Sequence, residues 1–317
     1  MTHRLTAAGA VTASVLVLCA AVPYLAPALD EPFYVIVFAR IMIWAIAAVS
    51  LNLIMGYGGM ISFGHAVYLG IGGYAVAILG FHDITSAWVQ LPVAIGLSAV
   101  VALVFGVICL RTRGIYFIMI TLALAQMVYF LSVSAERYGS DDGLNILWRS
   151  DFGTRHFDLE DSVVMYYTIF AVLLGCLLVK WRIVFSRFGM VLRASRSNDT
   201  RVQAVGVPTF RYRLVAFVIA GVMCGLAGFL QANLERFVSP DMMNWHRSGE
   251  LILMTVLGGT STLFGPVVGA VIFLMLSEIL STVTIHWHLV FGPFLVLVVL
   301  FARGGVMGLL GSRDTHD

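Results

Sequence analysis

Long apolar stretches separated by short polar ones run along nearly the whole sequence. The hydrocarbon core of a bilayer is about 30 Å thick, and a helix needs about 20 apolar residues to cross it. These stretches are too long and too uniformly apolar for the alternating strands of a barrel. The pattern therefore predicts an all-α, polytopic helical bundle, organised as one membrane domain over residues 1–317, with about ten transmembrane helices. The spans are expected near residues 7–28, 33–55, 62–81, 87–110, 115–134, 162–181, 212–234, 248–260, 264–283 and 286–302.

The distribution of charge predicts the orientation of these spans. Residues 180–213 carry eight basic side chains and one acidic one, whereas residues 136–161 carry seven acidic side chains and three arginines. Because cytoplasmic loops hold the excess of Lys and Arg, residues 180–213 are expected in the cytoplasm and residues 136–161 outside. Alternating the spans from a cytoplasmic Arg4 then places both termini in the cytoplasm. Residues 1–28 also resemble a cleaved signal peptide, an alternative that leaves the other spans unchanged.

Composition supports a lipid-immersed chain and excludes other classes. Hydrophobic residues make up 60% of the 317 residues and charged residues only 11%, against about 25% charged residues in soluble proteins. Such a chain has too few polar side chains to cover a water-facing surface. The net charge of +2 gives no reason to expect nucleic acid as a partner. The four cysteines lie in apolar stretches without a CxxC pair, so neither a disulfide framework nor a metal site is expected.

Two glycine-rich segments interrupt the apolar pattern. Residues 56–65 read GYGGMISFGH and residues 257–266 read LGGTSTLFGP, so each has paired glycines followed by a hydroxyl residue and a Phe-Gly pair. In the first segment we expect one helix to end near Met55 and Ser62 to cap the next helix. Broken helices at corresponding places in two halves are typical of transport pathways, and the short span at 248–260 is then a half helix. A tight turn between packed helices is the alternative.

Polar residues inside the predicted spans are costly in lipid and are therefore candidates for function. Arg40 is expected about two turns below the outer surface, where it needs a partner or a wet cavity. For His65, which has no carboxylate near it in the sequence, we expect a hydrogen-bonded packing role rather than proton relay. Together with the glycine-rich segments, these considerations give the predicted translocation pathway: Asn52, Gly58, Gly59, Ser62, His65, Gln126, Gly258, Gly259 and Glu278.

The longest inner connection, residues 182–211, has the pattern of a short amphipathic element. Residues 186–196 have helical spacing with apolar side chains on one side. Asn198 and Asp199 offer a cap for a second short helix from Thr200 to Val205. Such an element suits docking with a partner protein, and it suits equally a basic helix lying on anionic lipid. Physical chemistry alone leaves both interpretations open.

Several stretches carry a resemblance to a known family. They read AAVSLNLIMGYGGMISFGHAVYLGIGGYAVA (residues 47–77), RGIYFIMITLALAQM (113–127), SRFGMVLRASRSNDTRVQAVG (186–206), AFVIAGVMCGLAGFL (216–230) and LGGTSTLFGPVVGAVIFLMLSE (257–278). In this order they resemble the LivM-type permease subunits of branched-chain amino acid ABC importers. The resemblance implies a multi-pass protein of the bacterial inner membrane. It also implies as partners a second, LivH-like permease subunit, two cytoplasmic ATPase subunits and a periplasmic solute-binding protein.

The resemblance further implies that residues 186–206 form the coupling segment that rests in a groove of the ATPase. Its expected coupling residues are Phe188, Gly189, Leu192, Arg193, Arg196, Asn198 and Gly206. The family usually has an Ala-Ile-Arg-Glu-Asn-like core where this chain reads ASRSN at residues 194–198, so the detailed ATPase contacts are expected to differ. The sequence contains no GxxxxGK[ST] phosphate loop. ATP is therefore expected on the partner ATPases, and this chain is expected to be neither an enzyme nor the holder of a cofactor.

The expected mechanism is alternating access. A binding protein would deliver solute at the outer surface, around residues 136–161 and 235–249, and ATP-driven motion of residues 186–206 would close one side of the path as the other opens. Branched-chain amino acids, urea, short amides and aromatic acids are all carried by related permeases. An ion-coupled secondary carrier would instead require paired carboxylates or a His–Glu relay. A membrane-embedded enzyme would require clustered His, Asp or Glu.

Overall fold

The structure, a computed structural model, describes residues 7–25, 33–153, 158–260, 262–283, 286, 289, 291–294, 296 and 304–309. Most of the predicted tenth span, at 286–302, lies outside the described residues, as do both chain ends with Arg4, Arg303 and Arg313. The predicted orientation of the termini and the signal-peptide alternative therefore stay predictions.

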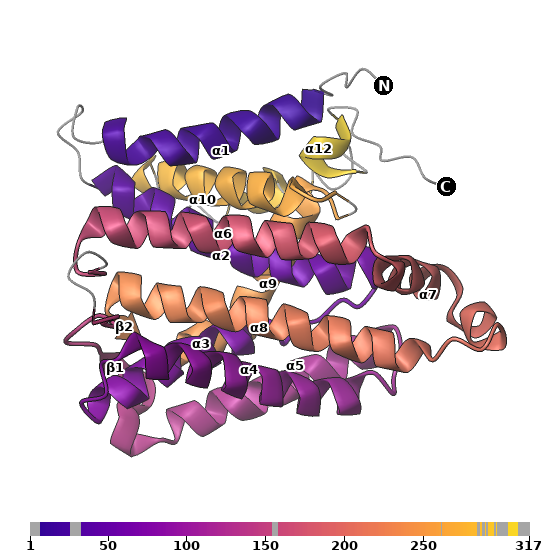
Figure 1. Cartoon of the computed structure of the whole chain (residues 1–317), viewed down its shortest axis with the longest axis horizontal. Helices are drawn as coiled ribbons and strands as arrows, with labels where there is room; N and C mark the ends of the chain where they lie inside the picture. Colours follow the sequence, from indigo (N-terminus) through magenta and orange to yellow (C-terminus); the bar gives the residue numbers. More distant parts are fainter. Residues whose placement is uncertain are drawn as a thin grey trace.

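The described part of the chain is built almost wholly from helices (Figure 1). The α-helices are α1 (Ala7–Leu25), α2 (Phe33–Asn52), α3 (Ala66–Phe81), α4 (Ala87–Cys109), α5 (Ile115–Val133), α6 (Ser162–Val184), α7 (Arg187–Ala204), α8 (Thr209–Glu235), α9 (Trp245–Gly258), α10 (Gly265–Val283) and α12 (Gly305–Leu309). One π-helical turn, η2 (Leu53–Tyr57), continues α2, and 3-10 turns lie at Glu136–Tyr138, Ser140–Asp142 and Pro240–Met243. The strands β1 (Leu144–Asn145) and β2 (Phe237–Val238) form a single antiparallel pair.

Six of these helical segments are long and apolar enough to cross a membrane. They are Phe33–Tyr57, Ala87–Cys109, Ile115–Val133, Ser162–Val184, Thr209–Glu235 and Gly265–Thr282. The all-α membrane bundle is therefore confirmed. A helix also occupies each of the first nine predicted spans, but α3 is a shorter apolar helix and α9 has only 14 residues. At 1.5 Å per residue α9 extends about 21 Å, which is less than the thickness of the hydrocarbon core.

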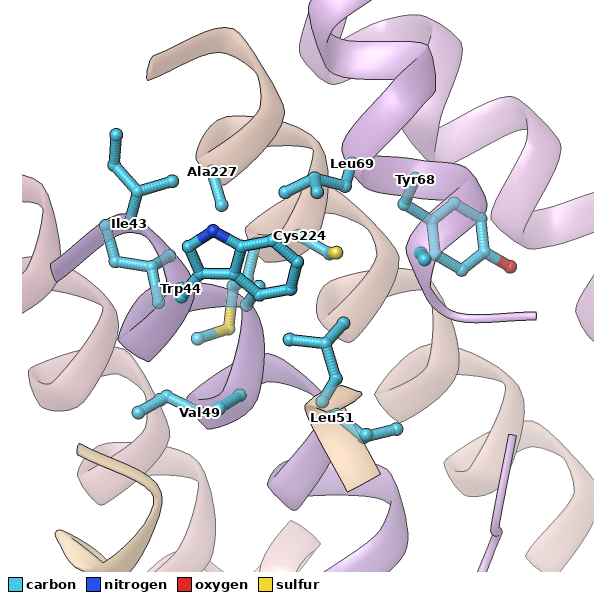
Figure 2. Packing of buried hydrophobic residues seen from close by; sticks show 14 of the residues in the cluster. Ile43, Trp44, Val49, Leu51, Tyr68, Leu69, Cys224 and Ala227 are labelled. Atoms are coloured by element: carbon cyan, nitrogen blue, oxygen red, sulfur yellow. The ribbon is translucent and has the colours of Figure 1, made fainter. Parts of the chain in front are cut away.

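The helices α2 and α8 form the centre of the bundle, whereas α4 and α5 lie at its periphery. In the most apolar 18-residue windows, 67% of the α2 and of the α8 residues are buried, against 17% for α5. Figure 2 shows Trp44 of α2 lying beside Leu69 of α3 and beside Cys224 and Ala227 of α8. The large apolar side chains that α4 and α5 expose, such as Leu103 and Leu131, suit a lipid environment.

Glycines bring α3 and α8 unusually close together. A methyl group at Gly72 would collide with the Gly225 carbonyl oxygen, and one at Gly228 would collide with the Leu69 carbonyl oxygen. Small residues at a helix crossing allow this approach of the two backbones, which is the usual basis of association between helices in membranes.

The two ends of the bundle carry different structures (Figure 1). At one end α7 projects beyond the helices that precede and follow it, α6 and α8. At the other end lie β1 and β2, and β2 contacts α3 and the end of α8. Arg149 anchors this second end, because its Nε donates to the Asn233 carbonyl oxygen at 2.9 Å and its Nη1 donates to the Leu159 carbonyl oxygen at 2.7 Å.

Candidate coupling and translocation sites

The first glycine-rich segment begins with the π-helical turn η2 at the end of α2. A π turn widens the helix and is frequent at functional sites. The chain then reverses at Gly59, whose φ of +67° is in the left-handed region that favours glycine. The prediction that Ser62 caps the next helix is wrong. Its hydroxyl accepts from the Gly64 amide at 3.3 Å, while the first amide of α3, that of Ala66, donates to Ser248 of α9 at 3.0 Å.

The second glycine-rich segment follows the same plan. The helix α9 ends at Gly258, and Gly259 has a φ of +115°. The Thr262 hydroxyl then accepts from the Gly265 amide at 3.0 Å and so satisfies an unpaired donor at the start of α10. Ser261 lies outside the described residues. In both segments a helix ends, a glycine with positive φ turns the chain, and a new helix begins within a few residues.

The two glycine-rich segments touch one another, although they lie about 200 residues apart in the sequence. The Asn52 side-chain amide donates to the Thr260 carbonyl oxygen at 2.8 Å. A methyl group at Gly56 would collide with that same oxygen, so only glycine permits the contact. The structure therefore brings Asn52, Gly258 and Gly259 of the predicted pathway into one region.

The connection between α6 and α8 is the helix α7, with two parts joined at a kink. The Ser186 hydroxyl accepts from the Gly189 amide at 3.3 Å and caps its first turn. Asn198 has non-helical angles, with φ −155° and ψ 98°. Its side-chain oxygen accepts from the Arg201 amide at 2.9 Å, which caps the second part of the helix. The predicted pair of helical pieces with a cap at Asn198 is therefore confirmed.

The predicted coupling residues fall into two groups by their environment. Leu192 and Gly189 are buried, and a methyl group at Gly189 would collide with the carbonyl oxygens of Ile183 and Val184. Phe188 packs on Tyr212 with ring centroids 5.4 Å apart. The other four residues are exposed: Arg193, Arg196, Asn198 and Gly206. Gly206 lies just after the end of α7 and has a φ of +88°.

Arg196 connects α7 directly to the first glycine-rich segment. Its Nη1 donates to the Gly56 carbonyl oxygen within η2. The aliphatic part of the same side chain lies against Gly59, and Leu192 lies against Gly58. A π turn leaves carbonyl groups without their regular helical partners, so an arginine donor compensates the loss. The contact joins residues that the sequence assigned to two separate roles, coupling and translocation.

Lys180 is a functional candidate that the sequence reasoning missed. It was counted among the basic residues of the segment 180–213, but it lies within α6 and is completely buried. Its Nζ donates to the Leu263 carbonyl oxygen at 2.9 Å and lies 5.7 Å from the centroid of the Tyr57 ring. Lys180 therefore contacts both glycine-rich segments. The feature of the sequence that could have identified Lys180 is its position at the end of an apolar run, directly before Trp181.

His65 ends the first glycine-rich segment, directly before α3, whereas Gln126 lies elsewhere in the bundle. His65 is buried, its Nε2 is 2.8 Å from the Ser50 hydroxyl, and its ring packs edge-on against Tyr68. Gln126 lies on the peripheral helix α5. Among the described residues, His65 Nδ1, Gln126 Nε2 and Asn52 Oδ1 are buried polar atoms without a hydrogen-bond partner. Such atoms are rare in native interiors and often mark places where water, an ion or a ligand binds.

Glu278 lies at the opposite end of the bundle from α7, in a cavity of about 450 Å³. The walls come from α2, α3, the end of α8, α9 and α10. Arg40 lines the same cavity and pairs with Glu235 at 3.2 Å. The expectation that Arg40 has a partner is therefore confirmed, and the side chain also lines a cavity. Glu278 is thus separate from the glycine-rich segments.

Comparison with known proteins gives the chain its family. Residues 33–302 match the family described as the permease component of branched-chain amino acid transport systems. The high-affinity branched-chain amino acid transport system permease protein LivM of Salmonella typhimurium is 26% identical in an alignment of 288 positions that covers 84% of this chain and 68% of LivM. LivH of Escherichia coli, a permease protein of the same kind of system, is 24% identical in an alignment of 286 positions that covers 84% of this chain and 91% of LivH.

A further relative is the L-arabinose ABC transporter permease protein AraH of Azospirillum brasilense, which is 27% identical in an alignment of 212 positions that covers 63% of this chain and 60% of AraH. No solved structure matches the chain. The family match extends over most of the sequence and over α2 to α10 of the structure. The chain is therefore a permease subunit of an ABC importer and belongs to the family of branched-chain amino acid transport system permease components.

Proposed function

We propose that this permease carries branched-chain amino acids, or a closely related small polar solute, across the bacterial inner membrane by alternating access. The LivM and LivH relatives support this substrate class. In the proposed assembly the chain pairs with a second, LivH-like permease subunit. Two cytoplasmic ATPases bind the ATP that this chain does not bind, and a periplasmic solute-binding protein delivers the solute. Both termini and α7 face the cytoplasm, and residues 136–161 face the periplasm.

The hydrogen bond from Arg196 to the Gly56 carbonyl carries the mechanistic part of the proposal. In the proposed mechanism α7 rests on the ATPase, and closure of the ATPase pair displaces it. Because Arg196 and Leu192 contact η2 and the residues after it, a displacement of α7 acts on the first glycine-rich segment without any intermediate element. The contact of Asn52 with Thr260 then passes the displacement to the second segment.

The exposed and buried residues of α7 have different parts in this proposal. Arg193 is the exposed basic side chain offered to the ATPase, and Asn198 sets the kink that separates the two halves of the helix. Arg193 donates to the neighbouring end of α6, at Val184, whereas Arg196 donates to η2 in the bundle, so the part of Arg196 is transmission toward the bundle rather than docking alone. The basic surface of α7 could also rest on anionic lipid, and the experiment below separates that alternative from coupling.

The test is Arg196→Met in the complete importer reconstituted in vesicles. Methionine keeps much of the apolar stem but cannot donate to Gly56. We expect the complex to assemble and bind ATP normally, while solute uptake and the stimulation of ATP hydrolysis by the loaded binding protein fall by about tenfold or more, the loss expected for a hydrogen bond from a charged donor. Arg187→Met is the matched control, since Arg187 is an exposed arginine of the same helix. Equal activity of the two variants would refute the proposed coupling route.

A further inference from the structure

The cavity that Arg40 and Glu278 line lies on the outer side in the proposed orientation and is called the outer cavity. It combines charges of both signs with apolar side chains. Four carboxylates and two guanidinium groups line it: Glu235, Asp241, Glu250, Glu278, Arg40 and Arg247. Its volume of about 450 Å³ is within the range of pockets that hold small ligands. The polar side chains around it are partly exposed, with the Arg40 side chain at 45% and that of Glu235 at 28%. The cavity is therefore open to solvent at the end of the bundle opposite α7.

Most of the charges in this cavity are already paired, whereas Glu278 forms no ion pair with any residue that the structure describes. Arg40 uses its Nε for Glu235 at 3.2 Å, which leaves its terminal N–H groups for another acceptor. Arg247 pairs with Asp241 at 2.7 Å and with Glu250 at 3.3 Å. Among the ion pairs of the described residues, none includes Glu278. One anionic and one partly available cationic group thus face the same space.

The buried part of the cavity lining, called its floor here, is apolar. Trp44 is 5% exposed, lines the cavity and packs into the core against α3 and α8 (Figure 2). Arg247 lies over the Trp44 ring, 5.9 Å from its centroid. Leu69 and Phe273 complete this floor. An aliphatic side chain directed toward the floor would therefore leave water, while charged groups of the same molecule stay among the polar walls.

We infer that this cavity is a receiving site for the zwitterionic form of an aliphatic amino acid, with Glu278 as the ligand of the ammonium group and Arg40 as the ligand of the carboxylate. The inference rests on the proposed function and names the substrate class that the permease itself accepts. A net charge of −2 on the lining disfavours a solute that carries only a carboxylate, such as an aromatic acid. A neutral solute such as urea can form hydrogen bonds with both groups, but it has no charge to pair with them and no aliphatic part for the apolar floor. Only an aliphatic zwitterion offers an opposite charge to Glu278 and to the terminal N–H groups of Arg40 together with a side chain for the floor.

The test uses a cysteine placed inside the cavity. Ser277 lines the cavity next to Glu278, and all four native cysteines of this chain are buried, so Ser277→Cys gives this chain one accessible thiol for a membrane-impermeant maleimide, with labelling read on this subunit. The permease heterodimer is placed in nanodiscs without the binding protein, and the labelling rate is measured with L-leucine, 3-methylbutylamine, 4-methylpentanoate or urea. We expect L-leucine to slow the labelling at a concentration about tenfold lower than the two singly charged analogues and urea to have no effect.

Two variants in the same background test the assigned ligands. With Glu278→Gln, L-leucine should protect no better than 4-methylpentanoate, and with Arg40→Gln no better than 3-methylbutylamine. Asp142→Asn is the matched control, because Asp142 is an exposed carboxylate that does not line the cavity, and it should leave protection unchanged. Protection that neither cavity variant alters, or equal protection by urea, would overturn the inference.

The outcome for this site is separable from that of the proposed function. If L-leucine fails to protect the Ser277→Cys thiol while the complete importer keeps ATP-driven uptake, the site is overturned and the proposed function stands. Intact protection by L-leucine in an importer without ATP-driven uptake would overturn the proposed function and leave the site standing.

Discussion

Replacing Lys180 by methionine tests whether a buried amine holds the two glycine-rich segments together for transport or only for stability. Lys180 is completely buried in α6, donates to the Leu263 carbonyl at 2.9 Å and lies above the Tyr57 ring. Methionine keeps an unbranched stem in the same space but removes the donor and the charge. The variant therefore releases residues 262–264 and η2 from α6 without opening a large cavity.

The expected change in the free energy of unfolding is small, because two large contributions oppose one another. The Leu263 carbonyl loses its partner, which costs about 1–3 kcal/mol, and the contact with the Tyr57 ring is worth about 0.5–2 kcal/mol. Burying a charged amine costs an effective penalty of several kcal/mol, and the absence of this penalty stabilises the variant. The net effect should lie within about 2 kcal/mol of zero, and a gain in stability is as consistent with this reasoning as a small loss.

Transport should change far more than stability. A hydrogen bond from a charged donor is worth about 1.5–3 kcal/mol, so a step that depends on it should slow by about tenfold to a hundredfold. The assay compares the melting temperature of the purified complex with its ATP-driven uptake in vesicles. Arg182→Met, at an exposed position of the same helix, should leave both unchanged. A Lys180→Met complex that melts far below the wild type, or that transports at the wild-type rate, would refute the reasoning.

Two other substitutions probe packing and a buried hydrogen bond. Gly72→Ala should push α3 from the Gly225 carbonyl and destabilise the chain by about 1–3 kcal/mol, read as a fall in melting temperature, whereas Gly96→Ala, which meets open space, should not destabilise it. His65→Gln should cost about 1–2 kcal/mol through the disturbed bond to Ser50 but leave the pH profile of uptake unchanged; a shifted profile would instead support proton relay by His65.

The arrangement of helices could be predicted from the sequence to the extent that it depends on local pattern. Uniform apolar stretches fixed the positions of α2, α4 and α8, because a helix is the structure that satisfies its own backbone in lipid. Glycine pairs and Asn198 predicted where helices end or kink, since the left-handed conformation and side-chain capping are local properties. The end of α6 was predicted at residue 181, because Arg182 was taken for a loop residue, although the helix continues to Val184.

Contacts between distant segments could not be predicted in this way. The pairing of Asn52 with Thr260 and of Arg196 with Gly56 depends on how the helices pack, and no local pattern encodes it. The cap of α3 shows the same limit, because Ser62 has the right chemistry and a nearby position, yet Ser248 from α9 accepts the first amide. The outer cavity likewise combines residues from five helices. Arg40 and Glu278 were noticed as polar residues within predicted spans, and residues 235–249 as outer surface, but the sequence did not predict that they line one cavity.

The helix α2 connects the two sites that the structure separates. Arg40 in the outer cavity and Asn52 beside the glycine-rich segments are 12 positions apart on this helix, a rise of about 18 Å. Every residue from Ile41 to Leu51 is buried, so packed core and not open space lies between the two sites. The π turn η2 continues α2 directly, and a regular helix transmits displacement along its axis. Under alternating access, a pull by Arg196 on η2 would therefore reach Trp44, and movement of this side chain would open the floor of the outer cavity.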